Sequence, residues 1–138
     1  MKPSSDFRIA VFPGDGIGPE VMAPCLRMLE QAVGEIGGFG LQFETLPAGA
    51  EYYRQSGQAL PAASMGAARK ADAILLAAMG LPEVRYADGT EVAPQLDLRF
   101  EFGLYAGVRP VLSVPGIPPV LGDPRAAHLD FVLIREST

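Results

Sequence analysis

The sequence predicts an α/β fold built on a mostly parallel β-sheet that helices cover on both faces. Short apolar runs, typical of strands in the core of a sheet, alternate with segments of helical periodicity. Glycine- and proline-rich turns separate these segments. The 138 residues are 49% hydrophobic and 20% charged, an ordinary globular composition with enough chain for one real core.

The chain opens with a strand, a glycine-rich turn and a helix. Residues 7–12 form a mostly apolar run, and "PGDGIG" follows. Pro19 suits the first helical turn, where its missing N–H costs nothing, and Glu20 favours the positive end of the helix dipole. We expect the helix to end near Ile36, at "GGFG", with Pro24 absorbed or giving a slight kink.

The middle of the chain continues this alternation. "LQFETLPAG" predicts a second strand, and "GAEYYRQSG" and "LPAASMGAARKA" predict two short helices. "ADAILLAAMG" (71–80) contains an unbroken apolar run and is expected to be a buried strand. A loop rich in turn residues then leads into "PQLDLRFEFG", which predicts one or two helical turns.

After residue 98 the strand–helix units give way to two strands joined by a long proline-rich connection. "LYAGVRPVL" is the first of these strands, and Pro110 indicates that it lies at a sheet edge or ends there. "LDFVLIREST" is the second. The expected organisation is therefore two parts, residues 1–98 and residues 99–138.

Charge and composition argue against several function classes. Net charge is −5 and lysine occurs only at positions 2 and 70, so we expect no nucleic-acid partner. Cys25 is the only cysteine and His128 the only histidine, which excludes an internal disulfide and disfavours a Cys/His metal site. The apolar helical pattern around Cys25 predicts a small buried hydrophobe. The start is not typical of a signal peptide and no run approaches the ~20 apolar residues of a membrane span, so we expect no membrane partner and a cytoplasmic location.

Two glycine-bearing loops are candidates for a ligand cleft. Ligands of parallel sheets lie beyond the carboxyl ends of the strands, so Gly14 and Gly80 are expected to line one cleft. Backbone N–H groups in such a turn can face a phosphate or carboxylate. The G-D-G-I-G spacing matches neither the dinucleotide fingerprint nor a phosphate loop, and a turn that merely needs positive φ angles is an equal alternative. Asp15 would either cap a helix or orient a ligand.

Three arginines lie in or beside apolar segments, at positions 99, 109 and 135. Three guanidinium groups in one cleft would hold a dicarboxylate through forked hydrogen bonds, which arginine forms better than lysine. Each arginine taken singly is also explained by a surface ion pair, because acidic residues are close in sequence. The residues alone leave both interpretations open.

Three motifs together resemble the isocitrate/isopropylmalate dehydrogenases, the β-decarboxylating dehydrogenases of 2-hydroxy acids that include tartrate dehydrogenase. They are "GDGIGPEV" (14–21), "LR…LYAGVRPV" (98–111) and "VLIREST" (132–138). The resemblance covers the whole chain but only the first third to two-fifths of a usual member. It implies a truncated three-layer fold of the isopropylmalate dehydrogenase type, not a Rossmann fold. Residues 1–98 would be part of the cofactor-side domain, and residues 99–138 the start of the second domain.

The resemblance also implies an activity: oxidation of a malate-type 2-hydroxy dicarboxylate by NAD or NADP, followed by decarboxylation, with Mg or Mn as a Lewis acid. The family's substrate-clamping arginines correspond by motif to Arg99, Arg109 and Arg135. The residues implied beside the cofactor cleft are Gly14, Asp15, Gly16, Ile17, Gly18 and Gly80.

Substrate choice in this family is made just before the first arginine. Isopropylmalate enzymes carry leucines there and isocitrate enzymes a serine and an asparagine, whereas this chain has "VAPQLDLR". Gln95 fits neither pattern. We therefore expect a substrate-binding role for Gln95 and a substrate with a polar or small substituent, as in tartrate or malate.

The family's catalytic tyrosine and lysine, metal-binding aspartates and adenine-binding segment have no counterpart in these 138 residues. We expect no catalytic or metal-binding residue here, a chain that is inactive alone, and a homodimeric full-length parent. An open apolar sheet edge or face should make the chain associate or melt easily. The alternative to a dehydrogenase is a non-catalytic anion-binding protein or regulatory-type subunit. An unrelated α/β nucleotide binder is a third hypothesis.

Overall fold

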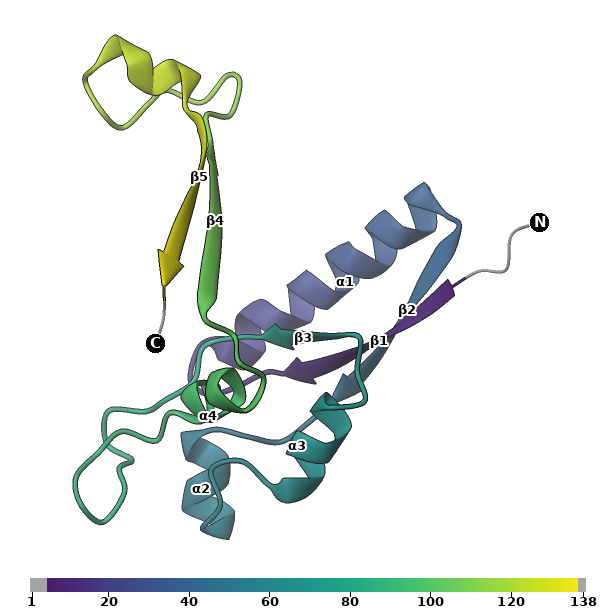
Figure 1. Ribbon diagram of the computed structural model, residues 1–138, viewed down its shortest axis with the longest axis vertical. Coiled ribbons are helices and arrows are strands. Elements are labelled where there is room, and N and C mark those ends of the chain that lie inside the picture. Colours follow the sequence, from purple (N-terminus) through teal and green to yellow (C-terminus); the bar gives the residue numbers. More distant parts are fainter. Residues whose placement is uncertain (1–4, 137–138) are drawn as a thin grey trace. The chain divides into compact units, whose positions relative to one another are not determined.

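A computed structural model describes residues 5–136, and the chain divides into two compact units, Met1–Leu98 and Arg99–Thr138 (Figure 1). The first unit contains all the parallel strands. Helix α4, Pro94–Glu101, runs across the boundary between the units. The other elements are β1 (Ser5–Phe12), α1 (Gly18–Ile36), β2 (Phe39–Thr45), α2 (Ala50–Ser56), α3 (Ala62–Ala68), β3 (Ala73–Leu76), β4 (Ala106–Leu112), a 3-10 helix (Pro124–His128) and β5 (Asp130–Glu136).

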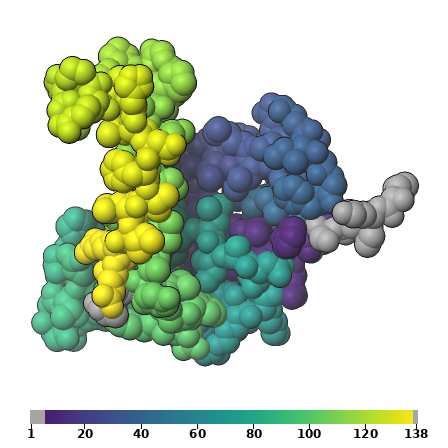
Figure 2. Space-filling view, turned by 45° about the horizontal axis from the view of Figure 1, so that its top comes forward, coloured from purple at the N-terminus to yellow at the C-terminus, as the bar shows by residue number. Residues whose placement is uncertain are grey.

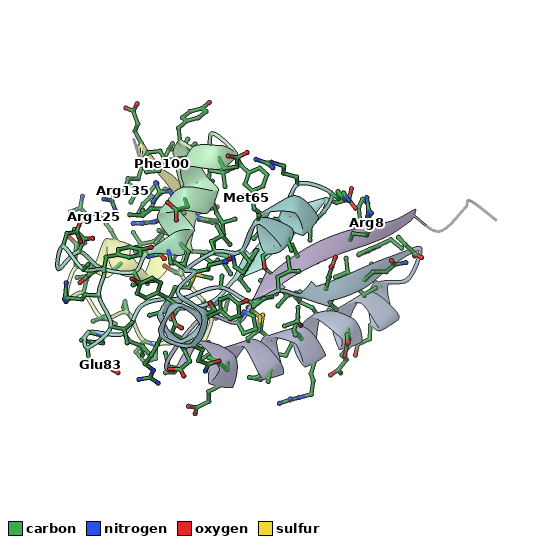
Figure 3. The ribbon with its side chains drawn as sticks, turned by 90° about the horizontal axis from the view of Figure 1, so that it is seen from below. Arg8, Met65, Glu83, Phe100, Arg125 and Arg135 are labelled. Atoms are coloured by element: carbon green, nitrogen blue, oxygen red, sulfur yellow. The ribbon has the colours of Figure 1, made fainter. Side chains whose placement is uncertain are left out.

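The first unit is built on a three-stranded parallel sheet in the order β2-β1-β3. Ile9 of the central strand stands opposite Phe43 of β2 and Ala73 of β3. Figure 3 shows α1 along one face of this sheet and α3 on the other. The core is centred on β1, where Val11 and Phe12 are fully buried. The predicted α/β class with a parallel sheet between helices is confirmed.

Helix α1 runs unbroken through Pro24, as the sequence allowed. It ends at Gly37, whose φ of 68° and N–H bond to the Val33 carbonyl (2.8 Å) close the last turn. Cys25 is half-buried rather than buried. Much of the apolar surface of α1 is open to solvent, and Met28 is 71% exposed. Among residues 5–136, no helix combines the length and apolar character that crossing a membrane requires.

The prediction of a buried strand within residues 71–80 is only partly right. Strand β3 covers four residues, Ala73–Leu76, and its side chains are exposed or half-exposed. The strand is less buried than predicted because β3 pairs with β1 alone and forms the edge of the described sheet. An apolar run predicts a strand, but whether that strand is buried depends on its neighbours.

The second unit contains an antiparallel ribbon of β4 and β5, which departs from the parallel pattern of the first unit. Every residue of β5 is exposed, including four consecutive apolar side chains from Phe131 to Ile134. Figure 2 shows this strand, in yellow, at the surface along its length. Pro110 is accommodated because a two-stranded ribbon has only edges. That this open apolar surface promotes association stays a prediction.

A small aromatic cluster packs the loop after β3 against α2. Tyr53 and Tyr86 meet edge to face, with ring centroids 5.0 Å apart. Burial raises the pKa of Tyr86 above its ordinary value of 10.0, and the negative charge of Asp97 adds to this effect. Neutral Tyr86 is therefore favoured in the folded state.

The raised pKa of Tyr86 predicts a pH dependence of stability. Its contribution is complete below the ordinary tyrosine pKa of 10.0, where the unfolded chain is also protonated. It is lost as pH rises through the folded-state pKa, because the unfolded state then binds fewer protons. As pH rises above about 10, we expect the urea midpoint to fall more steeply in the wild type than in Tyr86→Phe. Parallel pH profiles of the two proteins would contradict this.

Candidate functional site

The carboxyl edge of the parallel sheet is organised around one buried side chain, Asp15, which is 3% exposed. Its Oδ2 accepts hydrogen bonds from the backbone N–H groups of Ala50 (2.7 Å) and Gly80 (2.8 Å). Its Oδ1 accepts one from the N–H of Glu51 (2.8 Å). The backbone N–H of Asp15 also donates to the carbonyl of Ala78 (2.8 Å).

These contacts join the segments that follow all three parallel strands. Asp15 lies in the turn after β1, Ala50 and Glu51 begin α2 after β2, and Gly80 lies in the loop after β3. The sequence left open whether Asp15 caps a helix or orients a ligand. The structure shows that it caps α2 and not the helix next to it in sequence.

Three glycines allow the chain segments to approach this closely. A Cβ on Gly14 (φ 72°) would overlap the carbonyl oxygen of Ala78, and one on Gly18 would overlap that of Pro13. A Cβ on Gly49 (φ 116°) would lie 2.5 Å from both carboxylate oxygens of Asp15. Gly14 and Gly18 thus serve internal packing, and Gly49 is a site residue that the sequence reasoning missed.

The remaining residues of the predicted cofactor set face outward. Ile17 is 61% exposed, and a Cβ on Gly16 would approach only the Leu81 side chain, at 3.7 Å. Gly80 is exposed, and a Cβ there would come no nearer than 3.7 Å to the Val92 carbonyl oxygen. This outward group offers backbone that a ligand can approach.

A hollow of about 360 Å³ adjoins the turn, lined in part by Gly14, Asp15, Thr45, Ala48 and Tyr52.

Two of the three predicted arginines share one face of the ribbon. Arg109 stands opposite Leu133, and Arg135 stands opposite Gly107. Because residues opposite each other in an antiparallel pair point to the same side, and side chains alternate along each strand, both guanidinium groups project from the same face. Gly107 contributes no side chain beside Arg135. Both arginines are exposed, and neither forms an ion pair within residues 5–136.

Helix α4 carries the third arginine, Arg99, which is half-buried. The same helix begins at Pro94, so Gln95 lies in its first turn. The Oε1 atom of Gln95 is buried, yet it accepts no hydrogen bond from any part of the chain that the structure describes. A buried acceptor without a donor costs about 1–3 kcal/mol.

Within residues 5–136, no three His, Cys, Asp or Glu side chains gather in a way that could hold a metal ion. The last two residues of the third motif, Ser137 and Thr138, lie outside the described residues.

Comparison with known proteins identifies a matching family and several similar proteins. A family model described as isocitrate/isopropylmalate dehydrogenase matches residues 8–138. The chain is 38% identical to a probable tartrate dehydrogenase/decarboxylase of Agrobacterium vitis, over 96% of this chain and 37% of that protein. It is also 38% identical to a 3-isopropylmalate dehydrogenase of Thiobacillus denitrificans, over 95% of this chain and 38% of that protein.

A solved structure agrees. The isocitrate dehydrogenase of Methylococcus capsulatus superposes with a TM-score of 0.72 at 26% identity, covering 96% of this chain and 35% of that one. The chain therefore spans just over a third of the length of the relatives it matches.

Proposed function

The chain belongs to the isocitrate/isopropylmalate dehydrogenase family, and from this we propose that it supplies the N-terminal part of an NAD(P)-dependent oxidative decarboxylase of a malate-type 2-hydroxy dicarboxylate. Its relatives are decarboxylating dehydrogenases. The observation that carries the proposal is the pair of unneutralised arginines on one ribbon face. The parent enzyme is proposed to be a cytoplasmic homodimer, and the chain alone is expected to be inactive.

In this proposal the arginines bind and orient the two carboxylates of the substrate. Arg109 and Arg135 are diagonal neighbours across the ribbon, a separation of about 7–8 Å between Cα atoms. Their forked guanidinium groups each offer paired donors to a carboxylate, and Arg99 is the third member of the clamp. The substrate is then fixed with its C2 hydroxyl and hydrogen in a single orientation, which lowers the entropic part of the barrier.

The carboxyl edge of the sheet is proposed to bind the nucleotide. The outward group of Gly16, Ile17 and Gly80 would approach it, while Gly14, Asp15 and Gly18 shape the turn beneath. The bound nicotinamide would supply the hydride acceptor. Mg or Mn is proposed as the Lewis acid of the parent enzyme, but no three His, Cys, Asp or Glu side chains of residues 5–136 gather to hold it.

Dicarboxylate binding by the chain itself tests the proposal. We would titrate the isotope-labelled protein with D-malate or tartrate and follow the guanidinium N–H signals by NMR. We expect saturable shifts at Arg109 and Arg135, and none at Arg125, whose guanidinium is occupied by Asp123. Equal shifts at all three arginines would indicate screening alone and contradict a substrate clamp.

Gln95 is proposed to select a hydroxylated substrate, because it lies four residues before Arg99 on α4 and so shares a helix face with that arginine. The test uses a chimera in which this chain replaces the matching N-terminal 37% of the Agrobacterium vitis protein. In the chimera, Gln95→Leu should lower the ratio of kcat/KM for tartrate to that for isopropylmalate by about 10- to 200-fold, since one lost hydrogen bond and one gained apolar contact each change discrimination.

The matched control is Gln31→Leu, a substitution on the exposed face of α1, where Gln31 bonds only to Glu35. This variant should keep the wild-type ratio. If Gln95→Leu also leaves the ratio unchanged, Gln95 does not read the substrate.

A further inference from the structure

The buried carboxylate of Asp15 occupies the place of a ligand anion. The N–H groups at the first turn of a helix have no partner within the helix and attract anions. In α2 those of Ala50 and Glu51 are both taken by Asp15, and the N–H of Gly80 points to the same carboxylate. These donors are therefore used internally and are not open to the phosphates of a nucleotide.

Residue 15 holds the loop after β3 at two points. Its backbone N–H donates to the Ala78 carbonyl, and its side chain accepts from Gly80, two residues further on. The loop that carries Gly80 is thus fixed relative to the turn that carries Gly16. On the other side, Gly49 lies against the carboxylate so closely that no side chain fits between them.

We propose that Asp15 is a positioning residue that fixes the loops after all three parallel strands in one arrangement, so that the outward group of Gly16, Ile17 and Gly80 presents a single surface to the nucleotide. This inference rests on the proposed function. Asp15 itself touches no nucleotide, because its carboxylate is buried and saturated with hydrogen bonds from the protein.

The proposal predicts that formate restores the lost contacts in the variant Asp15→Ala. Truncation leaves a carboxylate-sized space lined by the N–H groups of Ala50, Glu51 and Gly80. Formate carries the missing group and should fill that space, whereas chloride at the same ionic strength should not. Rescue by formate would show that the loss comes from the missing carboxylate. A general loss of packing would not be reversed by formate.

Two measurements test this. NADH affinity of the chimera is followed by fluorescence titration, and the exchange of the three amide hydrogens is followed by NMR in the purified 138-residue chain. For Asp15→Ala we expect at least about tenfold weaker NADH binding and at least about tenfold faster exchange at all three amides, a factor that corresponds to losing one ordinary hydrogen bond. Formate should reverse both changes.

The matched control is Asp72→Ala. The Asp72 carboxylate also accepts a backbone hydrogen bond, from Arg8 at 2.8 Å, but just before β3 at the amino end of the sheet. This variant should leave NADH affinity and the three amides unchanged. Should Asp15→Ala fail to fold, Asp15→Asn keeps the shape and one acceptor oxygen, and faster exchange at one or more of the three amides is then expected.

The outcomes separate the two proposals. Wild-type exchange at all three amides in Asp15→Ala or Asp15→Asn would overturn the role of Asp15. Faster exchange with unchanged NADH affinity would overturn positioning of the nucleotide surface. If the wild-type chimera binds no NADH, the nucleotide site of the proposed function fails. If the amides of Asp15→Ala are nevertheless freed and formate protects them again, the linkage of the three loops stands.

Discussion

Replacing Arg109 with methionine in the chimera should lower kcat/KM for a 2-hydroxy dicarboxylate by about 10²–10³-fold. Arg109 is exposed in the chain, and in the proposed complex the bound substrate desolvates the charge pair. Truncating one partner of such a pair costs about 2–5 kcal/mol, and each 1.36 kcal/mol is a factor of about ten. Methionine keeps the apolar stem and much of the length of the side chain. The loss therefore reports the guanidinium group rather than the packing of the strand.

Two further variants make this prediction specific. Arg109→Lys keeps the charge but loses the planar fork, so an intermediate loss is expected. Arg125 lies on the 3-10 helix, and its guanidinium pairs with Asp123. Arg125→Met removes this guanidinium, and kcat/KM for the dicarboxylate should not change. An Arg109→Met chimera as active as Arg125→Met would show that Arg109 does not hold substrate.

The substitution Gly14→Ala should destabilise the first unit strongly, by about 2–6 kcal/mol in urea unfolding. Gly14 has a φ of 72°, and an added Cβ would overlap the carbonyl oxygen of Ala78, which is held in place by the N–H of Asp15. A left-handed non-glycine residue costs about 1–3 kcal/mol and forced overpacking about 1–3 kcal/mol more. The sum is a large part of the ~5–15 kcal/mol that holds a domain together.

Gly57→Ala is the matched control for this prediction. Gly57 has a similar φ of 76°, but no atom lies within 4 Å of an added Cβ. Only the backbone strain remains, and we expect a loss of about 1 kcal/mol in urea unfolding. Equal losses at the two positions would mean that the turn and the Ala78 loop are not in the close contact described.

The elements themselves could be predicted from the sequence, because strands, helices and their glycine stops follow from local patterns. The helix ending at Ile36 and the parallel sheet are confirmed. The antiparallel pairing of β4 with β5 was not predicted, since pairing between distant segments leaves no mark in the local pattern. The edge position of β3 escaped prediction for the same reason.

In the candidate site, too, some features follow from the local sequence and others depend on distant segments. The sequence grouped Gly14 with Gly16, but only the position of Ala78, far along the chain, shows that one packs inward and the other faces solvent. A signal for the role of Asp15 was present, however. Helix α2 begins after Gly49, which offers no side chain to cap it, so its first N–H groups require an acceptor from elsewhere.

The arginines illustrate what strand register adds. Their presence in apolar segments suggested an anion, with surface ion pairs as the alternative. The pairing of Gly107 with Arg135 places Arg109 and Arg135 on one face, which alternation along a single strand could not decide. Placing Arg99 and Gln95 on one helix follows from the sequence, but the orphaned Oε1 of Gln95 does not.

The most direct test of the central claim is turnover by the chimera with wild-type residues 1–138. Reduction of NAD or NADP would be followed spectrophotometrically with tartrate, D-malate and isopropylmalate, alongside the unmodified Agrobacterium vitis protein and the isolated chain. We predict substrate-dependent reduction by the chimera with release of carbon dioxide, and none by the isolated chain. A soluble, cooperatively folded chimera that binds dicarboxylate without reducing the nucleotide would contradict the dehydrogenase and favour a non-catalytic anion-binding protein.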